Sequence, residues 1–281
     1  MPELPEVEIM TRNARAWMLG QPVADVLFSD ALLNEGAAGS RNRLLASRMI
    51  GLPVSQVQRR GKVMFVDTAV AGFAVHFRMT GKWVLNESVR RTRFTVMLDS
   101  FSADRCSLVD TRRLGTVEFH DASGREAAIH RLGLGPEPWP EPLAWTEWRQ
   151  RLSGKMSIKQ QLLDGARISG LGNICASELL WRSGIHPITP GRDVRPAQWK
   201  KLAAVCAPWI DEVIREESAP EIGYVNESGV HPDAFAVYAR DGQPCRRCGT
   251  AIERMVQGGR GTWLCPRCQP APLLRRSPKV P

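Results

Sequence analysis

Two Cys-x-x-Cys pairs near the C-terminus constrain the fold of this chain more than any other feature. Cys245 and Cys248 form the first pair, Cys265 and Cys268 form the second, and sixteen residues lie between the pairs. Four thiolates at this spacing suit a tetrahedral Zn²⁺ ion with no open coordination position. A redox or disulfide role is the weaker interpretation, because such paired motifs in a reducing compartment usually hold metal. The sequence therefore predicts one structural zinc ion, and residues 250–262 predict a β-hairpin whose tip is 257–261.

Charge is the second constraint. The 281 residues include 38 Lys and Arg against 29 Asp and Glu, a net charge of +9, which favours a polyanionic partner, although excess charge also serves solubility. The 43% hydrophobic content allows one or two domains with buried cores. No apolar run approaches the ~20 residues that span a bilayer, and no signal peptide is visible. We therefore expect a cytoplasmic protein without membrane contact.

The N-terminus carries a possible nucleophile beside carboxylates. Met1 before Pro2 is normally removed, which leaves Pro2 with a secondary amine that is partly neutral at pH 7. Such an amine can attack an aldehyde-type carbon to form an iminium, and the carboxylates of Glu3, Glu6 and Glu8 could transfer protons. The plainer interpretation is an acidic helix start, with Pro5 opening a helix that runs to about Arg15. The two interpretations are compatible.

Hydrophobic patterns predict an α+β protein of several domains. Residues 1–135 read as the first helix and an antiparallel β-sandwich, with strands separated by Gly, Asn, Asp and basic turns. The proline-rich segment 136–140 reads as a linker. Helical periodicity fills 141–240. The zinc module spans 241–269, and the Pro- and Arg-rich tail 270–281 is expected to be disordered.

Basic residues of the first domain concentrate in its turns. Three segments, 59–62, 76–81 and 110–115, read Arg-Arg-Gly-Lys, His-Phe-Arg-Met-Thr-Gly and Asp-Thr-Arg-Arg-Leu-Gly. Basic side chains on loops can reach phosphates, and an apolar tip beside Arg can fill a gap in a base stack. The alternative is an ordinary solvated loop. In the helical domain, Gly170-Leu171-Gly172-Asn173 makes a tight turn with exposed amides and a helix cap, which suits an anion but is a weak signal alone.

Taken in order, these segments resemble the formamidopyrimidine-DNA glycosylase family, whose sister branch is the endonuclease VIII type. The resemblance rests on Met-Pro-Glu-Leu-Pro-Glu-Val-Glu at the N-terminus, Arg-Arg-Gly-Lys, His-x-x-Met-Thr-Gly, Asp-x-Arg-Arg-x-Gly, the Gly-x-Gly-Asn turn and the cysteine pairs. It covers essentially the whole chain. It implies a helix-two-turn-helix in the helical domain and a zinc-ribbon hairpin at the C-terminus.

The resemblance also implies roles for individual residues. Pro2 is the nucleophile, Glu3 the proton donor, and Glu6 orients the sugar site, while Lys62 and Arg260 meet phosphates and assist elimination. Met79, Arg112 and Leu114 fall where the family has the trio that fills the space of an extruded nucleotide; Phe is common at the third position. Arg93 stands where His is expected. The full set of implied DNA-binding residues is His76, Met79, Arg93, Arg112, Arg113, Leu114, Lys155 and Asn173.

The implied function is a bifunctional DNA glycosylase and abasic-site lyase of base-excision repair, which extrudes an oxidised base, mainly a purine, from double-stranded DNA. We expect a monomer without a small-molecule cofactor. Leu4 favours the purine branch, since the endonuclease VIII branch usually has Gly there. Residues 221–235 do not match the purine branch's base-covering loop, so oxidised pyrimidines stay an alternative. A second alternative is a non-catalytic DNA-damage sensor on the same scaffold.

Overall fold

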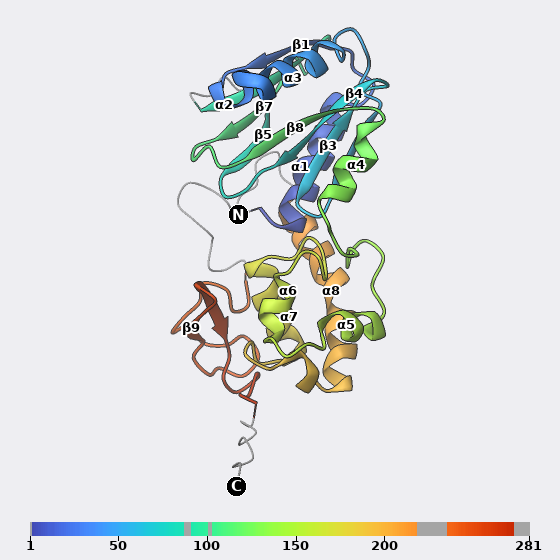
Figure 1. Ribbon diagram of the computed structural model, residues 1–281. Coiled ribbons are helices and arrows are strands. Elements are labelled where there is room, and N and C mark those ends of the chain that lie inside the picture. The colour runs from blue at the N-terminus through green and yellow to red at the C-terminus, as the bar shows by residue number, and fades with distance from the viewer. Residues whose placement is uncertain (1, 87–90, 101–102, 218–234, 273–281) are drawn as a thin grey trace. The chain divides into compact units, whose positions relative to one another are not determined.

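The computed structural model describes residues 2–86, 91–100, 103–217 and 235–272 (Figure 1). The chain divides into two compact units, one of residues 1–134 and 213–225 and the other of residues 135–212 and 226–281. The predicted borders at 140 and 240 both fall inside the second unit and stay predictions. Within the described residues, no helix has the length and apolar character needed to cross a lipid bilayer.

The first unit is built on two four-stranded antiparallel sheets, which confirms the predicted antiparallel architecture. One sheet has the strand order β1-β6-β7-β5 and the other β2-β3-β4-β8, with every pair antiparallel. The strands of the first sheet are β1 (Val23–Phe28), β6 (Thr92–Leu98), β7 (Arg105–Asp110) and β5 (Gly81–Leu85). Those of the second are β2 (Gln56–Arg60), β3 (Val63–Asp67), β4 (Ala71–His76) and β8 (Thr116–Asp121).

Aromatic side chains from both sheets meet in the core between them. The rings of Phe73 on β4 and Phe94 on β6 lie edge to face with centroids 5.1 Å apart. Trp83 and Phe119 pack against the same pair, and all four are buried. Burying a large apolar side chain stabilises a fold by about 1.5–3 kcal/mol, so this cluster holds the sandwich together.

Helix α1 (Leu4–Met18) begins the chain and packs on the sandwich. It starts with Pro at its second position and buries Val7, Met10, Ala14 and Met18, which recur every three or four residues on one face. The predicted helix is therefore present and extends one turn further than expected. The unit also contains α2 (Ala31–Asn34), α3 (Gly36–Ser47) and α4 (Gly124–Arg131).

The second unit joins short helices to the C-terminal hairpin (Figure 1). Its helices are α5 (Trp145–Leu152), α6 (Ile158–Leu162), α7 (Asn173–Ser183), the 3₁₀ turn η1 (Gly191–Asp193) and most of α8 (Pro196–Glu217). Strands β9 (Glu253–Gln257) and β10 (Arg260–Leu264) form the hairpin. Helix α7 ends at Gly184, which has φ of 69°, a conformation that glycine adopts without steric cost.

A buried carboxylate of α7 fixes the backbone of residues 236–238. Glu178 on α7 is fully buried and accepts hydrogen bonds from the backbone N–H groups of Ala236, Val237 and Tyr238 at 2.9–3.0 Å. Of the predicted segment 221–235, only Phe235 belongs to the described residues. Of the predicted tail 270–281, residues 273–281 also lie outside them.

Candidate active site and nucleic-acid interface

The start of α1 holds two carboxylates in a fixed, buried arrangement. The Glu3 backbone N–H donates to Oε2 of Glu6, and the Glu3 side chain accepts from the Glu6 backbone N–H. This reciprocal capping satisfies two amides that the first turn of a helix otherwise leaves without partners. Glu3 and Glu6 are each only 2% exposed, and Pro2 is buried beside them. The sequence-predicted nucleophile and its neighbouring acids therefore lie together.

Burial makes Glu6 a proton carrier at neutral pH. Desolvation, reinforced by the negative charge of Glu3, raises the pKa of Glu6 from 4.5 to about 8. At pH 7 the Glu6 carboxyl is therefore mostly protonated. A protonated carboxyl beside a reacting group can donate its proton and later accept one.

A second carboxylate of α1 fixes the turn that carries Lys62. Oε2 of Glu8 lies 3.0 Å from Nε of Arg59, whose Nη1 donates to the carbonyl of Gly61 at 2.9 Å. The Arg59 side chain is 4% exposed, so this ion pair is little weakened by solvent. Lys62 follows directly in the β2–β3 turn and is half-buried. Sequence reasoning offered Glu8 as a proton-transfer group and Arg59 as part of a basic turn, but it did not pair them, because the two residues are 51 positions apart.

His76 at the end of β4 is held in its neutral form. Burial, followed by the positive charges of Arg78 and Lys62, lowers the pKa of His76 to about 4. Its Nδ1 accepts a hydrogen bond from the Arg78 backbone N–H at 3.1 Å. Nε2 therefore carries the ring proton and is a neutral donor at pH 7.

The two predicted wedge segments are joined through one buried carboxylate. Met79 and Leu114 are 40% and 45% exposed, and Arg112 is exposed beside Leu114. Oδ1 of Asp110 accepts from Oγ1 of Thr80 at 2.5 Å and from the Arg112 backbone N–H at 3.2 Å. The turn that carries Met79 and the loop that carries Leu114 are thus fixed to each other, with their apolar ends in solvent.

The prediction that Arg93 contacts DNA does not fit the structure. Its side chain is 3% exposed, and Nε lies 2.6 Å from Oδ2 of Asp30, so it has no surface to offer a phosphate. A β-bulge turns it inward. The exposed arginine in this stretch is Arg91, two residues earlier, which the sequence did not distinguish because the position of a bulge cannot be read from local composition. Arg113 is exposed as predicted, with its side chain 58% accessible.

In the second unit, the hairpin tip is bonded to the predicted helix-two-turn-helix. Asn173 Nδ2 donates to the carbonyl of Gly261 at 3.0 Å, and the buried Lys159 donates to the same carbonyl at 3.0 Å and to Thr262 Oγ1 at 2.6 Å. Asn173 Oδ1 is buried and has no hydrogen-bond partner among the described residues. Arg260, next to Gly261, is exposed, and so is Lys155. Lys159 was not among the predicted site residues, since a buried lysine gives no local signal.

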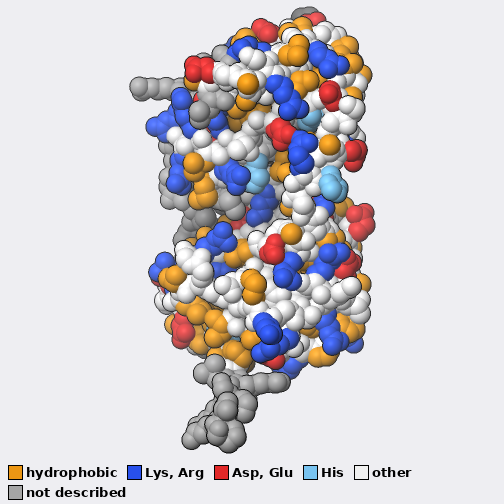
Figure 2. Space-filling model, viewed as in Figure 1, with side chains coloured by type: hydrophobic (Ala, Val, Ile, Leu, Met, Phe, Trp, Pro, Cys, Tyr) orange, Lys and Arg blue, Asp and Glu red, His pale blue; other side chains and the backbone are white. Residues whose placement is uncertain are grey.

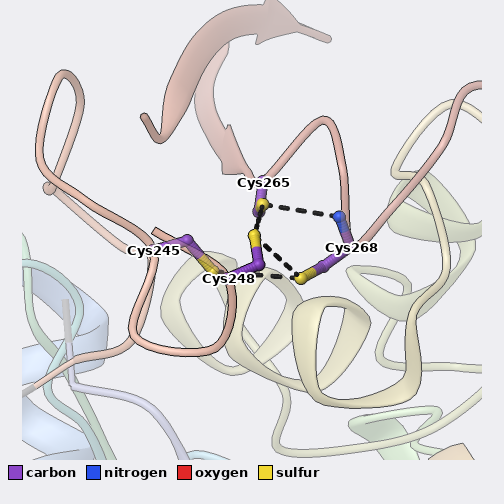
Figure 3. A group of neighbouring side chains, drawn as sticks. All are labelled: Cys245, Cys248, Cys265 and Cys268. Carbon is purple, nitrogen blue, oxygen red and sulfur yellow. Dashed lines mark hydrogen bonds between the residues drawn. The ribbon is translucent and has the colours of Figure 1, made fainter. Parts of the chain in front are cut away.

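The four cysteines lie around one point (Figure 3). All four sulfur atoms are within 4.8 Å of one another, and three Sγ–Sγ distances are 3.9, 3.4 and 3.5 Å. Zn–S bonds of about 2.3 Å in a tetrahedron place the sulfur atoms about 3.8 Å apart, so the residues fit the ion. The Arg247 and Cys268 backbone N–H groups point at Cys245 and Cys265, as expected around thiolates. Cys245, Cys248, Cys265 and Cys268 form the predicted structural zinc site, which fills all four coordination positions.

The sequence contains more basic than acidic side chains, and both units have exposed arginines, such as Arg112 and Arg260. Figure 2 shows Lys and Arg spread over the viewed face of both units, interspersed with apolar side chains. In the first unit, Pro2, Glu3 and Glu6 lie at the helix start, and His76 is the last residue of β4. Four further residues lie in the turns of the sandwich: Lys62, Met79, Arg112 and Leu114. In the second unit, Lys155, Asn173 and Arg260 come from three segments, and the hydrogen bonds to Gly261 bring Asn173 beside Arg260.

Comparison with known proteins covers nearly the whole chain. Family models match the formamidopyrimidine-DNA glycosylase N-terminal domain at residues 1–117, its H2TH domain at 134–221, and a zinc finger found in FPG and IleRS at 242–271. The formamidopyrimidine-DNA glycosylase of Burkholderia cenocepacia is 34% identical, over 96% of this chain and 100% of that protein.

Two solved structures of Lactococcus lactis Fpg each align with a TM-score of 0.83 over 96% of this chain and 100% of theirs. One is a complex with DNA containing Fapy-dG, at 25% identity, and the other a complex with DNA containing an oxidised pyrimidine, at 26%. The architecture, the four zinc ligands and the match over nearly the whole chain all indicate the same family. The chain belongs to the formamidopyrimidine-DNA glycosylase family.

Proposed function

We propose that this protein is a bifunctional DNA glycosylase and abasic-site lyase of base-excision repair. One observation carries the proposal: in a member of this family, the buried start of α1 combines Pro2 with Glu3 and with Glu6, whose raised pKa keeps its carboxyl protonated at pH 7. The net charge of +9 suits a DNA partner.

The proposed chemistry starts from an extruded nucleotide, because C1′ of the deoxyribose is out of reach inside the base stack. After Met1 has been removed, the Pro2 nitrogen bonds to C1′ as the glycosidic bond breaks, and the departing base takes up the proton that this nitrogen loses. Opening of the sugar then breaks the C1′–O4′ bond, with proton transfer from Glu3 to O4′, and gives a cationic iminium between Pro2 and C1′. The iminium acidifies the C2′ proton, whose loss expels the 3′ phosphate; a second elimination expels the 5′ phosphate.

Other residues would orient the DNA around this centre. We propose that Glu6 orients the sugar site and that Lys62 and Arg260 bind phosphates next to the lesion. Neutral His76 would donate a hydrogen bond to the DNA backbone. Met79, Arg112 and Leu114 would fill the space that the nucleotide leaves. Arg113, Lys155 and Asn173 would hold phosphates on both sides, which fixes the register on a duplex.

For the substrate, we propose ring-opened formamidopyrimidines and other oxidised purines, with 8-oxoguanine excised less efficiently. Leu4 in the N-terminal motif and the Fapy-dG complex of the Lactococcus lactis relative support this choice. The relative's complex with an oxidised pyrimidine keeps thymine glycol-type lesions as the second candidate. We also propose that the protein works as a monomer in the cytoplasm, where the bacterial chromosome lies, and needs no small-molecule cofactor.

Reductive trapping tests the chemistry directly. Borohydride should reduce the iminium and leave the protein covalently bound to an oligonucleotide with an abasic site, through Pro2. A version that retains an N-terminal extension should give no adduct, because an acylated nitrogen cannot form an iminium. Trapping by the extended protein would refute the role of Pro2, and absence of trapping by the mature protein would favour the non-catalytic alternative. An incision panel with one defined lesion per duplex then ranks the substrates.

A further inference from the structure

Three charged side chains are buried beneath the loop that carries Arg112 and Leu114. Asp30 is 2% exposed, Arg93 is 3% exposed and Asp110 is fully buried. Two carboxylates thus flank one guanidinium. A second basic side chain, Arg113, lies at the surface, with its Nη1 3.9 Å from Oδ1 of Asp30.

A β-bulge is what brings Arg93 into this position. Thr92 pairs with Val109 and Phe94 pairs with Leu108, so Arg93 is an additional residue on β6 between successive partners on β7. Its Nε lies 2.6 Å from Oδ2 of Asp30, and its Nη1 donates to the carbonyl of Gly115. The same Nη1 lies 3.8 Å from Oδ2 of Asp110.

Arg93 and Asp110 together hold both ends of the loop. Asp110 accepts from the backbone N–H of Arg112 and, at 2.6 Å, from that of Gly115. Arg93 binds the carbonyl of Gly115, so the last residue of the loop is held through both its amide and its carbonyl. The backbone at Gly115 packs closely on Asp110, because a Cβ at this position would lie 3.1 Å from Oδ2 of Asp110.

Stability alone is a weak reason for this arrangement. Burying charges costs desolvation energy, and well-packed apolar residues often stabilise a fold equally well or better. A guanidinium, by contrast, presents several donors in one rigid plane, and can join a carboxylate to a carbonyl at a fixed angle. Such a group suits the task of fixing a loop in one geometry.

We propose that the Arg93–Asp30 pair is a positioning device for the loop of residues 110–115, and that it determines how well Arg112 and Leu114 occupy the space of an extruded nucleotide. The inference rests on the proposed function. Arg93 acts through the loop and contacts neither the lesion nor the reacting atoms. Its loss should therefore impair extrusion from a paired duplex, where the vacated space must be filled, more than the chemistry that follows.

The test compares one lesion in two settings, paired within a duplex and present as an unpaired bulged nucleotide, whose extrusion costs less. Single-turnover excision rates are measured for both, and their ratio, paired over bulged, is the readout. Because a partly unfolded variant loses both rates equally, the ratio does not depend on the active fraction. The variants are Arg93→Lys and the double change Asp30→Asn with Arg93→Gln, which removes both charges together if the single variant fails to fold.

The matched control is Arg125→Lys, which weakens another ion pair of the same unit; Nε of the half-buried Arg125 lies 3.0 Å from Oδ2 of Asp67. We expect the Arg93 variants and Leu114→Ala each to lower the ratio about tenfold, whereas Arg125→Lys stays within twofold of wild type. Wild-type ratios in both Arg93 variants would overturn the inference, and so would a wild-type ratio for Leu114→Ala. Failure of the wild-type protein to form a borohydride adduct would instead refute the proposed function.

Discussion

Replacing Lys159 by Met should loosen the zinc hairpin without touching any predicted DNA contact. The ammonium is buried and donates to Gly261 O and Thr262 Oγ1 at 3.0 and 2.6 Å, so it joins α6 to the hairpin. A methionine has similar length and keeps the apolar stem packed. The change therefore removes the two hydrogen bonds and little else.

The size of the effect follows from those two bonds. A hydrogen bond to a charged group contributes about 1.5–3 kcal/mol, and removing the ammonium also removes the cost of burying it. A net loss of about 2 kcal/mol is expected, which corresponds to a roughly thirtyfold larger population of hairpins detached from α6. Asn173 still donates to Gly261, so the hairpin should not be lost altogether.

Zinc transfer to a chromogenic chelator measures this opening, and we expect its rate to rise about thirtyfold in Lys159→Met. Lys155→Met is the matched control, since Lys155 lies four residues earlier and is exposed. It should leave zinc transfer unchanged but reduce the salt dependence of DNA binding by about one phosphate contact. A transfer rate for Lys159→Met within threefold of the wild-type rate would refute the assigned function of the hydrogen bonds.

Three further predictions concern the acids and the metal. Glu3→Gln should lose base excision at least 100-fold but retain cleavage of a preformed abasic site, which needs no leaving-group assistance; equal loss in both incision assays would show a broader role. The pKa of Glu6 is raised, so its protonated form contributes stability below pH 4.5 that is lost as the pH rises through about 8. Glu6→Gln should therefore melt higher than wild type at pH 8–9, and matching melting curves would argue against a buried proton. Cys265→Ser should weaken duplex binding at least tenfold by misplacing Arg260 while the first unit melts normally; metal analysis that finds no zinc in the wild-type protein would contradict it.

The elements whose sequences have a clear apolar periodicity could be predicted from the sequence. The short apolar segment 23–28 predicts a strand, which the structure has as β1, and the helical periodicity of 196–217 predicts a helix, which it has as α8. The cysteine spacing gave the zinc ligands directly. These features are local, because spacing along the chain determines which side chains share a face or a metal.

Elements whose formation depends on distant contacts could not be predicted. The pair Thr80-Gly81 reads as a turn, yet β5 begins at Gly81, because this segment pairs with β7 at the sheet edge. Helix α3 buries only Gly39, Leu45 and Ala46, too few to give a helical pattern, and the sequence of residues 44–49 fits either a short helix or a loop. The same limit explains Arg93, whose inward direction depends on a bulge and on Asp30, 63 residues away.

The three amides held by Glu178 have a consequence for engineering. The backbone of residues 236–238 is anchored to α7 by a carboxylate. A replacement for the residues before 236 therefore does not have to provide this anchor. Replacing the residues between Glu217 and Phe235 by the corresponding stretches of relatives should yield folded chimaeras. Such a panel would test whether the choice of lesion can be transplanted with this stretch, separately from the scaffold.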